Sequence, residues 1–349
     1  MRQPAAVRLG AVLAIVAALP TLLLGTAAAA VAVDDAPRVV CRFDDQRLVE
    51  VSGITWSRRH PGFYWVHNDS GGGPYLYAID GRTCRTVARV RVSGIGARDL
   101  EAIATGVDPA GRPVLWVGDI GDNRASWPSV RLIAVPEPAR LIDQEVSATT
   151  YRFTYPDGGN DAESIIADPE SARVWVVSKA IARGSVYRVP LSASRVTTAV
   201  PIADVGGLST DAAMSPDGRR FVIRDYLRAQ IYDAPVTAAS LARPTRLDLP
   251  AQRQGESITF TADSSALLVA SEGEREVWLV PLPASGGPTP SVPGSATALP
   301  AESPVAADPV AADPVASTSG ARGWRLGLAA LALLTAAAAG VVAARRFRA

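Results

Sequence analysis

The sequence predicts an all-β fold, a β-propeller, on three observations. Of the 349 residues, 48% are hydrophobic and 20% are charged, which is the composition of a globular protein. The 29 glycines and 27 prolines favour frequent turns over long helices. A strand–turn–strand pattern recurs five times along the middle of the chain. Repeats of this period are typical of propellers, whose blades are four-stranded sheets arranged around an axis.

Each copy of the repeat has the pattern of a β-hairpin, with two apolar runs joined by a turn rich in Pro, Gly, Asp and Ser. The copies begin at Ser52, Glu101, Glu163, Asp211 and Glu256. Two weaker, alternating runs follow each of the first four copies; for the second copy they lie at residues 130–135 and 150–154. The count predicts five blades, and a sixth is possible in the long second unit.

The ring is predicted to close between its first and last blades. The fifth copy supplies only three strands, and the run at residues 38–43 has no blade of its own. We expect this run to complete the fifth blade as its outer strand, which protects the sheet edge. Cys41 lies in that strand and Cys84 lies near the outer strands of the first blade. Because the chain has two cysteines and is predicted to be exported, we expect one disulfide; two free thiols are the alternative.

The N-terminal residues are predicted to lie outside the propeller. Residues 1–32 have the pattern of a secretory signal peptide, with positive charges at Arg2 and Arg8, an apolar run and a final Ala-x-Ala cleavage pattern. An uncleaved membrane anchor is the alternative for this segment. The propeller ectodomain then occupies residues 33–282.

The C-terminal part is predicted to anchor the protein in a membrane. Residues 283–322 are rich in Pro and Ala and poor in large apolar side chains, which indicates an extended stalk. Residues 323–344 contain an uncharged apolar run long enough to cross a bilayer. The basic tail at residues 345–349 stays in the cytoplasm by the positive-inside rule. We therefore expect a single-pass protein of the cell membrane with the propeller outside.

Acidic residues recur at equivalent positions in the copies of the repeat. The inner strand of a blade lines the central channel and pairs antiparallel with the next strand of the blade. The first residues of the inner strand and the last residues of the next strand therefore lie at the same mouth of the channel. In the pairs Asp99 with Glu101 and Asp161 with Glu163, strand alternation predicts both carboxylates on one side. The candidate metal ligands are Asp99, Glu101, Asp119, Asp122, Asp161, Glu163 and Glu256. The candidate ligand-binding residues are His67, Asn68, Asp69, Lys179, Arg224, Asp211 and Glu272.

Such a cluster of carboxylates indicates a cation site. Close carboxylates raise one another's pKa, pair with Lys or Arg, or bind a metal ion. Oxygen ligands on loops suit Ca²⁺ better than zinc. Only Lys179, the single lysine of the chain, and Arg224 are expected as cations nearby, with Lys179 acting as a counter-charge. The alternative is that each polar side chain satisfies backbone groups at a strand end.

Several motifs resemble known propellers. The hairpin at residues 215–222 resembles the repeat of TolB-like propellers. The motifs around His67, Asp99, Asp119 and Asp161 look like those of secreted actinobacterial propeller proteins, which are distantly similar to phytase-like propellers. The phytase-like resemblance implies six blades. It also implies an enzyme that uses calcium in an acidic channel mouth to hydrolyse phosphate esters. A phosphate-rich substrate needs several basic side chains, and this sequence offers few at that mouth.

Two functions are compatible with these features. Basic and acidic side chains number 35 and 34, which argues against a nucleic-acid partner. The first function is a surface-displayed recognition module with a Ca²⁺-binding acidic mouth, whose partner is an extracellular ligand or a cell-wall component. The second is a Ca²⁺-dependent hydrolase of the phosphoesterase kind. His67 is a weaker candidate for a catalytic base. Trp65, Trp116 and Trp175 are expected to pack between blades rather than to stack on a sugar.

Overall fold

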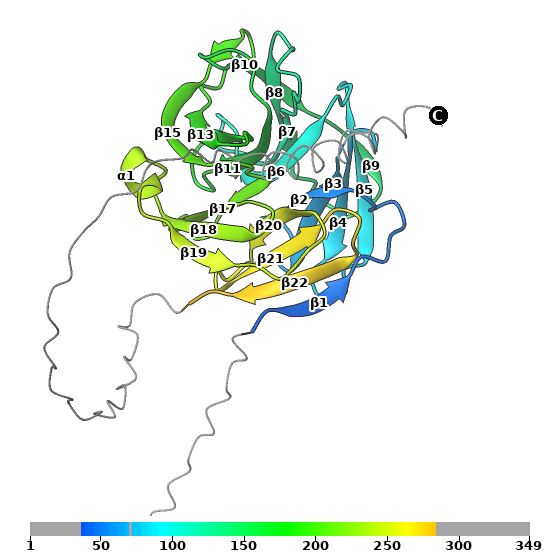
Figure 1. Cartoon of the computed structure of the whole chain (residues 1–349). Helices are drawn as coiled ribbons and strands as arrows, with labels where there is room; N and C mark the ends of the chain where they lie inside the picture. The colour runs from blue at the N-terminus through cyan, green and yellow to red at the C-terminus, as the bar shows by residue number, and fades with distance from the viewer. Residues whose placement is uncertain (1–35, 70–71, 284–349) are drawn as a thin grey trace, which may run out of the picture. The chain divides into compact units, whose positions relative to one another are not determined.

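The computed structural model describes residues 36–69 and 72–283. The strands in these residues form five sheets around a common centre, and their pairing is antiparallel apart from one added edge strand in each of two sheets (Figure 1). The innermost strands contact one another in the cyclic order β2, β6, β11, β16, β20 and back to β2. The chain is therefore a five-bladed β-propeller, as the repeat count predicted.

The first two blades each carry one strand more than the usual four. Blade 1 consists of β2 (Val51–Trp56), β3 (Phe63–Asn68), β4 (Tyr75–Asp80) and β5 (Thr86–Ser93), with β9 (Gln144–Ser147) added in parallel. Blade 2 consists of β6 (Leu100–Val107), β7 (Pro113–Asp119), β8 (Val130–Pro136) and β10 (Thr149–Thr154), with β14 (Thr197–Thr198) added in parallel. The possible sixth blade is not formed, because the surplus residues of the second unit provide β9 at the edge of blade 1.

The other three blades have four strands each. Blade 3 consists of β11 (Ala162–Ala167), β12 (Val174–Ser178), β13 (Arg183–Arg188) and β15 (Val200–Gly206). Blade 4 consists of β16 (Asp211–Met214), β17 (Arg220–Arg224), β18 (Arg228–Asp233) and β19 (Thr245–Asp248), and the short helix α1 (Ala238–Leu241) precedes β19. Blade 5 consists of β20 (Gly255–Phe260), β21 (Ala266–Ser271), β22 (Glu276–Pro281) and β1 (Arg38–Arg42).

The hydrophobic core lies between blades rather than inside them. Five apolar clusters are buried, one at each blade-to-blade interface, including the one between blades 5 and 1. Trp65, Trp116 and Trp175 belong to three of these clusters, as expected for core packing. Since both faces of the inner strands are covered by neighbouring blades, these strands read as continuous apolar runs in the sequence.

The closure of the ring was predicted correctly. Strand β1 pairs antiparallel with β22 and completes blade 5 as its outer strand. Cys41 in β1 forms a disulfide with Cys84, which lies between β4 and β5 of blade 1. The disulfide therefore joins the last blade to the first.

The segments predicted at the two ends of the chain are not part of residues 36–69 and 72–283. The signal peptide, the stalk from residue 284 onwards, the transmembrane helix and the basic tail lie outside the described residues. Within residues 36–69 and 72–283, none of the helices has the length and apolar character needed to span a bilayer.

The disulfide is expected to contribute substantially to stability. It links residues 43 positions apart, and restricting the unfolded chain to such a loop stabilises the fold by about 4 kcal/mol in the chain-entropy model. Replacing Cys41 and Cys84 together by Ala should lower the free energy of unfolding by up to that amount, measured by urea denaturation of the full-length protein. Reducing agent should destabilise the wild type and leave the double variant unchanged. Two alkylatable thiols in the folded, unreduced protein would contradict the bond.

Candidate functional site

Four inner strands carry a β-bulge at the same position. In β2, β6, β11 and β20 the pairing register shifts at the second residue of the strand, so one residue there has no partner on the neighbouring strand. These extra residues are Ser52, Glu101, Glu163 and Glu256. A bulge interrupts the alternation of side chains and changes the direction in which one of them points. All three glutamates are buried at the face where the inner strands begin, which we call the acidic face.

The β-bulges show that one step of the sequence interpretation was wrong. Strand alternation was expected to place Asp99 with Glu101, and Asp161 with Glu163, on one side of a strand. Instead, Asp99 and Asp161 precede β6 and β11, and each glutamate occupies a bulge. Asp99 and Glu101 still lie close together, because the bulge rather than the period of two brings them to the same place.

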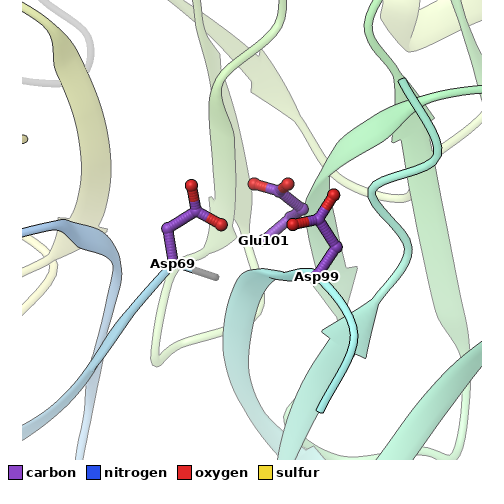
Figure 2. A group of neighbouring side chains, drawn as sticks. All are labelled: Asp69, Asp99 and Glu101. Atoms are coloured by element: carbon purple, nitrogen blue, oxygen red, sulfur yellow. The ribbon is translucent and has the colours of Figure 1, made fainter. Parts of the chain in front are cut away.

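Three carboxylates converge at the acidic face. Asp69, Asp99 and Glu101 each offer an oxygen atom, and these atoms all lie within 4.8 Å of one another. Figure 2 shows the three side chains pointing toward one another, with Asp69 on a different segment from Asp99 and Glu101. Asp69 follows β3, where its backbone N–H donates to the carbonyl of Glu50 at 2.8 Å. The group therefore joins blade 1 to blade 2.

Asp119 supports this cluster without belonging to it. One carboxylate oxygen accepts the backbone N–H of Asp99 at 3.1 Å, and the other forms ion pairs with Arg98 and Arg131. The expectation of only two cations at this face was therefore wrong, because the two arginines neutralise Asp119. The positions of Arg98 and Arg131 relative to the repeat do not indicate this contact.

Gly121 is a residue of the candidate site that the sequence interpretation missed. A Cβ atom at Gly121 would lie 2.7 Å from Oδ2 of Asp99 and would also collide with Oε1 of Glu101. The loop after β7 can cover the two carboxylates this closely only because residue 121 has no side chain. The glycine in the acidic turn at residues 118–123 was the available signal.

Asp122 and Asp161 hold the neighbouring loop. The carboxylate of Asp122 accepts the backbone N–H groups of Ser126 and Trp127 at 2.9 and 2.7 Å. Its own backbone N–H donates to Oδ1 of Asp161 at 3.1 Å. These two predicted metal ligands thus make structural hydrogen bonds within the described part of the site, and Asp161 adds negative charge near the cluster.

Lys179 is the counter-charge on the other side of the acidic face. Its ammonium forms an ion pair with Glu163 and lies 5.3 Å from the centre of the Tyr226 ring. This confirms the prediction that it faces the carboxylates rather than the solvated rim. Glu256 accepts a hydrogen bond from the amide of Gln254 at 2.7 Å, and the same amide contacts Glu272.

Asp211 and Arg224 tie blade 4 to blade 5. Strand β16 has no bulge, and the Asp211 carboxylate accepts the backbone N–H groups of Ala212 and Ile258 at 2.8 and 2.7 Å. The buried guanidinium of Arg224 donates to the carbonyls of Asp225 and Ser257. It also occupies the space that a Cβ at Gly255 would need. Both predicted ligand-binding residues are thereby engaged in the frame of the ring.

His67 and Asn68 shape the segment that leads to Asp69. His67 is fully buried, and burial lowers its pKa to about 4, so its imidazole is neutral at physiological pH. Its Nδ1 contacts the carbonyl of Asn68 at 2.9 Å, and its Nε2 packs against Gly53. The amide of Asn68 donates to the carbonyl of Arg47 at 2.6 Å. His67 thus contributes to the packing between Gly53 and Asn68, with both ring nitrogens enclosed by the protein.

Burial and mutual repulsion raise the pKa of the clustered acids. The pKa of Asp99 rises to about 7, first through burial and then through the charges of Asp69, Asp161 and Asp119. Burial, followed by repulsion from Glu163, raises the pKa of Glu101 well above its usual range. Burial also raises the pKa of Glu163 to about 8, although Lys179 opposes the shift. At neutral pH the cluster therefore either keeps protons or requires a cation.

Comparisons with known proteins add little beyond the fold. No protein-family model matches the chain, and no curated protein matches it. One similar solved structure is a luciferin-regenerating enzyme, with 14% sequence identity and a TM-score of 0.39, covering 66% of this chain and 77% of that chain. At this level of similarity neither an activity nor a ligand is transferred. What the fold and the site define is a five-bladed propeller with a partly buried carboxylate cluster on one face.

Without metal, the stability of the protein should fall as the pH rises. The ordinary pKa of Asp99 is 3.8 and its folded value is about 7, so between these values the folded state binds more protons than the unfolded state. In chelator, the melting temperature of the full-length protein should therefore be higher at pH 5 than at pH 8. Asp99→Asn combined with Glu101→Gln should flatten this dependence, whereas Asp248→Asn, whose exposed carboxylate lies on β19, should not. A profile that rises from pH 5 to pH 8 in the wild type would refute the assignment.

Breaking the Lys179 ion pair should destabilise the ring. The side chains of Lys179 and Glu163 are 18% and 9% exposed, so Lys179→Met leaves an uncompensated buried acid. We expect a loss of about 1–3 kcal/mol in the free energy of unfolding at pH 8, and a smaller loss at pH 6, where Glu163 takes up a proton. Chemical denaturation at the two pH values measures the difference. Equal losses of unfolding free energy at the two pH values would show that the stabilisation by Lys179 does not depend on the charge of Glu163.

Proposed function

We propose that the acidic face binds one Ca²⁺ ion through Asp69, Asp99 and Glu101. The observation that carries this proposal is the 4.8 Å limit on the separation of the three oxygen atoms. Ca²⁺ binds oxygen ligands at about 2.3–2.6 Å, so two ligands of one ion lie at most about 5 Å apart. The donors are all carboxylates, which favours a hard cation over zinc. Gly121 places no side chain against the oxygen atoms of Asp99 and Glu101 that would bind the ion.

Recognition is favoured over hydrolysis of a phosphate ester. A phosphoesterase stabilises the charge of the phosphate with available Arg or Lys side chains or with metal ions. The two cations that the sequence placed at this face are engaged, Lys179 with Glu163 and Arg224 with backbone carbonyls. Arg98 and Arg131 are paired with Asp119. We therefore propose a binding module in which the ion organises the acidic face and bridges to a ligand with oxygen donors.

We further propose that the propeller is displayed outside the cell membrane on a stalk with a single-pass anchor, its C-terminus in the cytoplasm. The signal-peptide pattern of residues 1–32 and the apolar run within residues 323–344 support this orientation. The disulfide between Cys41 and Cys84 also supports it, because such bonds persist in oxidising compartments. The partner class is an extracellular ligand or a cell-wall component.

Calcium binding can be tested on the purified full-length protein. A calorimetric titration should show one site, and Ca²⁺ at about 100 times its Kd should add about 2.7 kcal/mol to the stability. Glu101→Gln and Gly121→Ala should each weaken binding, the first by removing a ligand charge and the second by filling the space beside it. Asp248→Asn is the matched control and should bind like the wild type.

Two outcomes would overturn the proposal. Identical melting temperatures in Ca²⁺ and in chelator would mean that the site does not exist. Calcium-stimulated turnover of a generic phosphate ester such as p-nitrophenyl phosphate, lost in Glu101→Gln, would establish the hydrolase instead of the recognition module.

A further inference from the structure

A cavity of about 330 Å³ lies between blades 3 and 4, at the face opposite the acidic face. It is lined by the turn that joins β11 to β12, the turn that joins β16 to β17, and the segment between β18 and α1. These two turns follow the inner strands, whereas the acidic face lies where the inner strands begin. The cavity is larger than the one of about 220 Å³ around Tyr155, beside the loop that follows β7. Its volume falls in the range of about 300–1,000 Å³ that is typical of small-molecule sites.

The buried part of the cavity wall is apolar. Trp175, Met214 and Val236 line it, and they belong to the apolar cluster between blades 3 and 4. Ala234 and Pro235, which are less buried, extend this apolar surface. Among the described residues that line the cavity there is no Ser, Thr, Tyr, Asn or Gln, and the indole N–H of Trp175 is enclosed by protein. The wall therefore offers no side-chain hydroxyl or amide to a ligand with many hydroxyl groups.

Backbone hydrogen bonds fix the rim of the cavity. The N–H of Ala234 donates to the carbonyl of Arg219 at 2.8 Å, which joins the segment before α1 to the turn between β16 and β17. Within that turn the N–H of Gly218 donates to the carbonyl of Ser215 at 2.8 Å, and Gly218 has a φ of 67°. The carboxylate of Asp217 accepts the N–H of Arg219 at 3.1 Å and the hydroxyl of Ser215 at 2.6 Å. The position of Arg219 beside the cavity is therefore set by the turn and needs no ligand.

Arg219 is the charged residue of this lining that has no ion pair. The other two, Asp168 and Arg173, pair with each other at 2.6 Å. Asp168 also accepts the backbone N–H groups of Glu170 and Ser171 at 2.9 and 3.0 Å, so its carboxylate is fully engaged. The guanidinium of Arg219 is exposed, and within residues 36–69 and 72–283 it forms neither an ion pair nor a hydrogen bond. The lining thus presents one available positive charge next to an apolar wall.

This combination matches an anion with one charged head and an apolar body. The planar fork of an arginine binds a carboxylate through two parallel hydrogen bonds. A phosphate group carries more charge and more acceptor oxygens than one guanidinium satisfies, and the described lining has no second cation that is free. Apolar groups of the ligand that leave water for the surface of Trp175, Met214 and Val236 add a hydrophobic contribution.

We propose that this cavity binds a small apolar monocarboxylate, with the carboxylate on Arg219 and the hydrocarbon part against Trp175, Met214 and Val236. The site lies on the opposite face of the propeller from the candidate calcium site and does not depend on it.

Titration with soluble acids and their amides tests the proposal. The purified full-length protein is titrated with phenylacetate and hexanoate, and in parallel with phenylacetamide and hexanamide, by saturation-transfer NMR. At least one acid should bind saturably and about tenfold more tightly than its amide, the factor that one charge-assisted hydrogen bond contributes at its lower limit. Arg219→Gln should remove this difference, and Arg219→Lys should retain part of it, because an ammonium is a cation without the planar fork. Neither variant should change the melting temperature, since Arg219 is exposed and unpaired within the described residues.

Controls separate this site from the rest of the molecule. Arg246→Gln, which changes an exposed arginine on β19 outside the cavity, should bind the acids like the wild type. Ala234→Leu should block acids and amides alike by filling the cavity; if it does not fold, the Arg219 variants still decide. Absence of saturable binding of both acids, amides that bind as tightly as the acids, or full affinity in Arg219→Gln would overturn the proposal.

Two further measurements exclude other sites and other anions. Binding of the acids should persist in chelator, and its loss there would place the carboxylate on the metal instead. Tighter binding of benzylphosphonate than of phenylacetate would assign the cavity to phosphate groups and overturn the carboxylate assignment. Failure of the calcium titration alone would leave the cavity site standing.

Discussion

The closure of the ring is the constraint on which the rest of this structure depends. Each sheet buries both faces only if a neighbouring blade covers it, and the first and last blades can cover each other only when the ring is complete. The pairing of β1 with β22, the apolar cluster between blades 5 and 1, and the bond from Cys41 to Cys84 all act at this one interface. With five blades closed in this way, the inner strands come into mutual contact, and their first residues are forced together at one face.

The bulges place acids at this crowded face. In a regular strand the side chain at the second position would point into one of the interfaces between blades, where a carboxylate without a partner is strongly disfavoured. The bulge moves Glu101, Glu163 and Glu256 out of the ladder. The resulting repulsion is reduced in different ways around the ring, by Lys179 at Glu163 and by Gln254 at Glu256. Beside Asp99, Arg98 and Arg131 pair with Asp119, whose other oxygen atom accepts the backbone N–H of Asp99, so this part of the face is organised differently from the surroundings of Glu163 and Glu256.

The sequence predicts the repeated features of this protein far better than the unrepeated ones. Blade number, the closing strand and the disulfide follow from periodicity and from where the two cysteines fall in the repeat. Lys179 could be placed because it stands where other copies carry acids. The bulges were not predictable, because one extra residue in a strand leaves the apolar pattern almost unchanged. The contacts of Gly121 and the cavity around Tyr155 depend on how irregular loops pack against each other. The conformation of an irregular loop does not follow from the periodicity of the sequence.

The loop after β7 borders the candidate metal site and, further along, a cavity of about 220 Å³. Its first part carries Gly121, whose backbone covers Asp99 and Glu101, and its later part carries Trp127, which lines the cavity. Asp122 stands between them and is fixed on both sides, by Asp161 through its N–H and by Ser126 and Trp127 through its carboxylate. Because the loop is anchored at this residue, a change of charge at the carboxylates does not have to move the cavity wall.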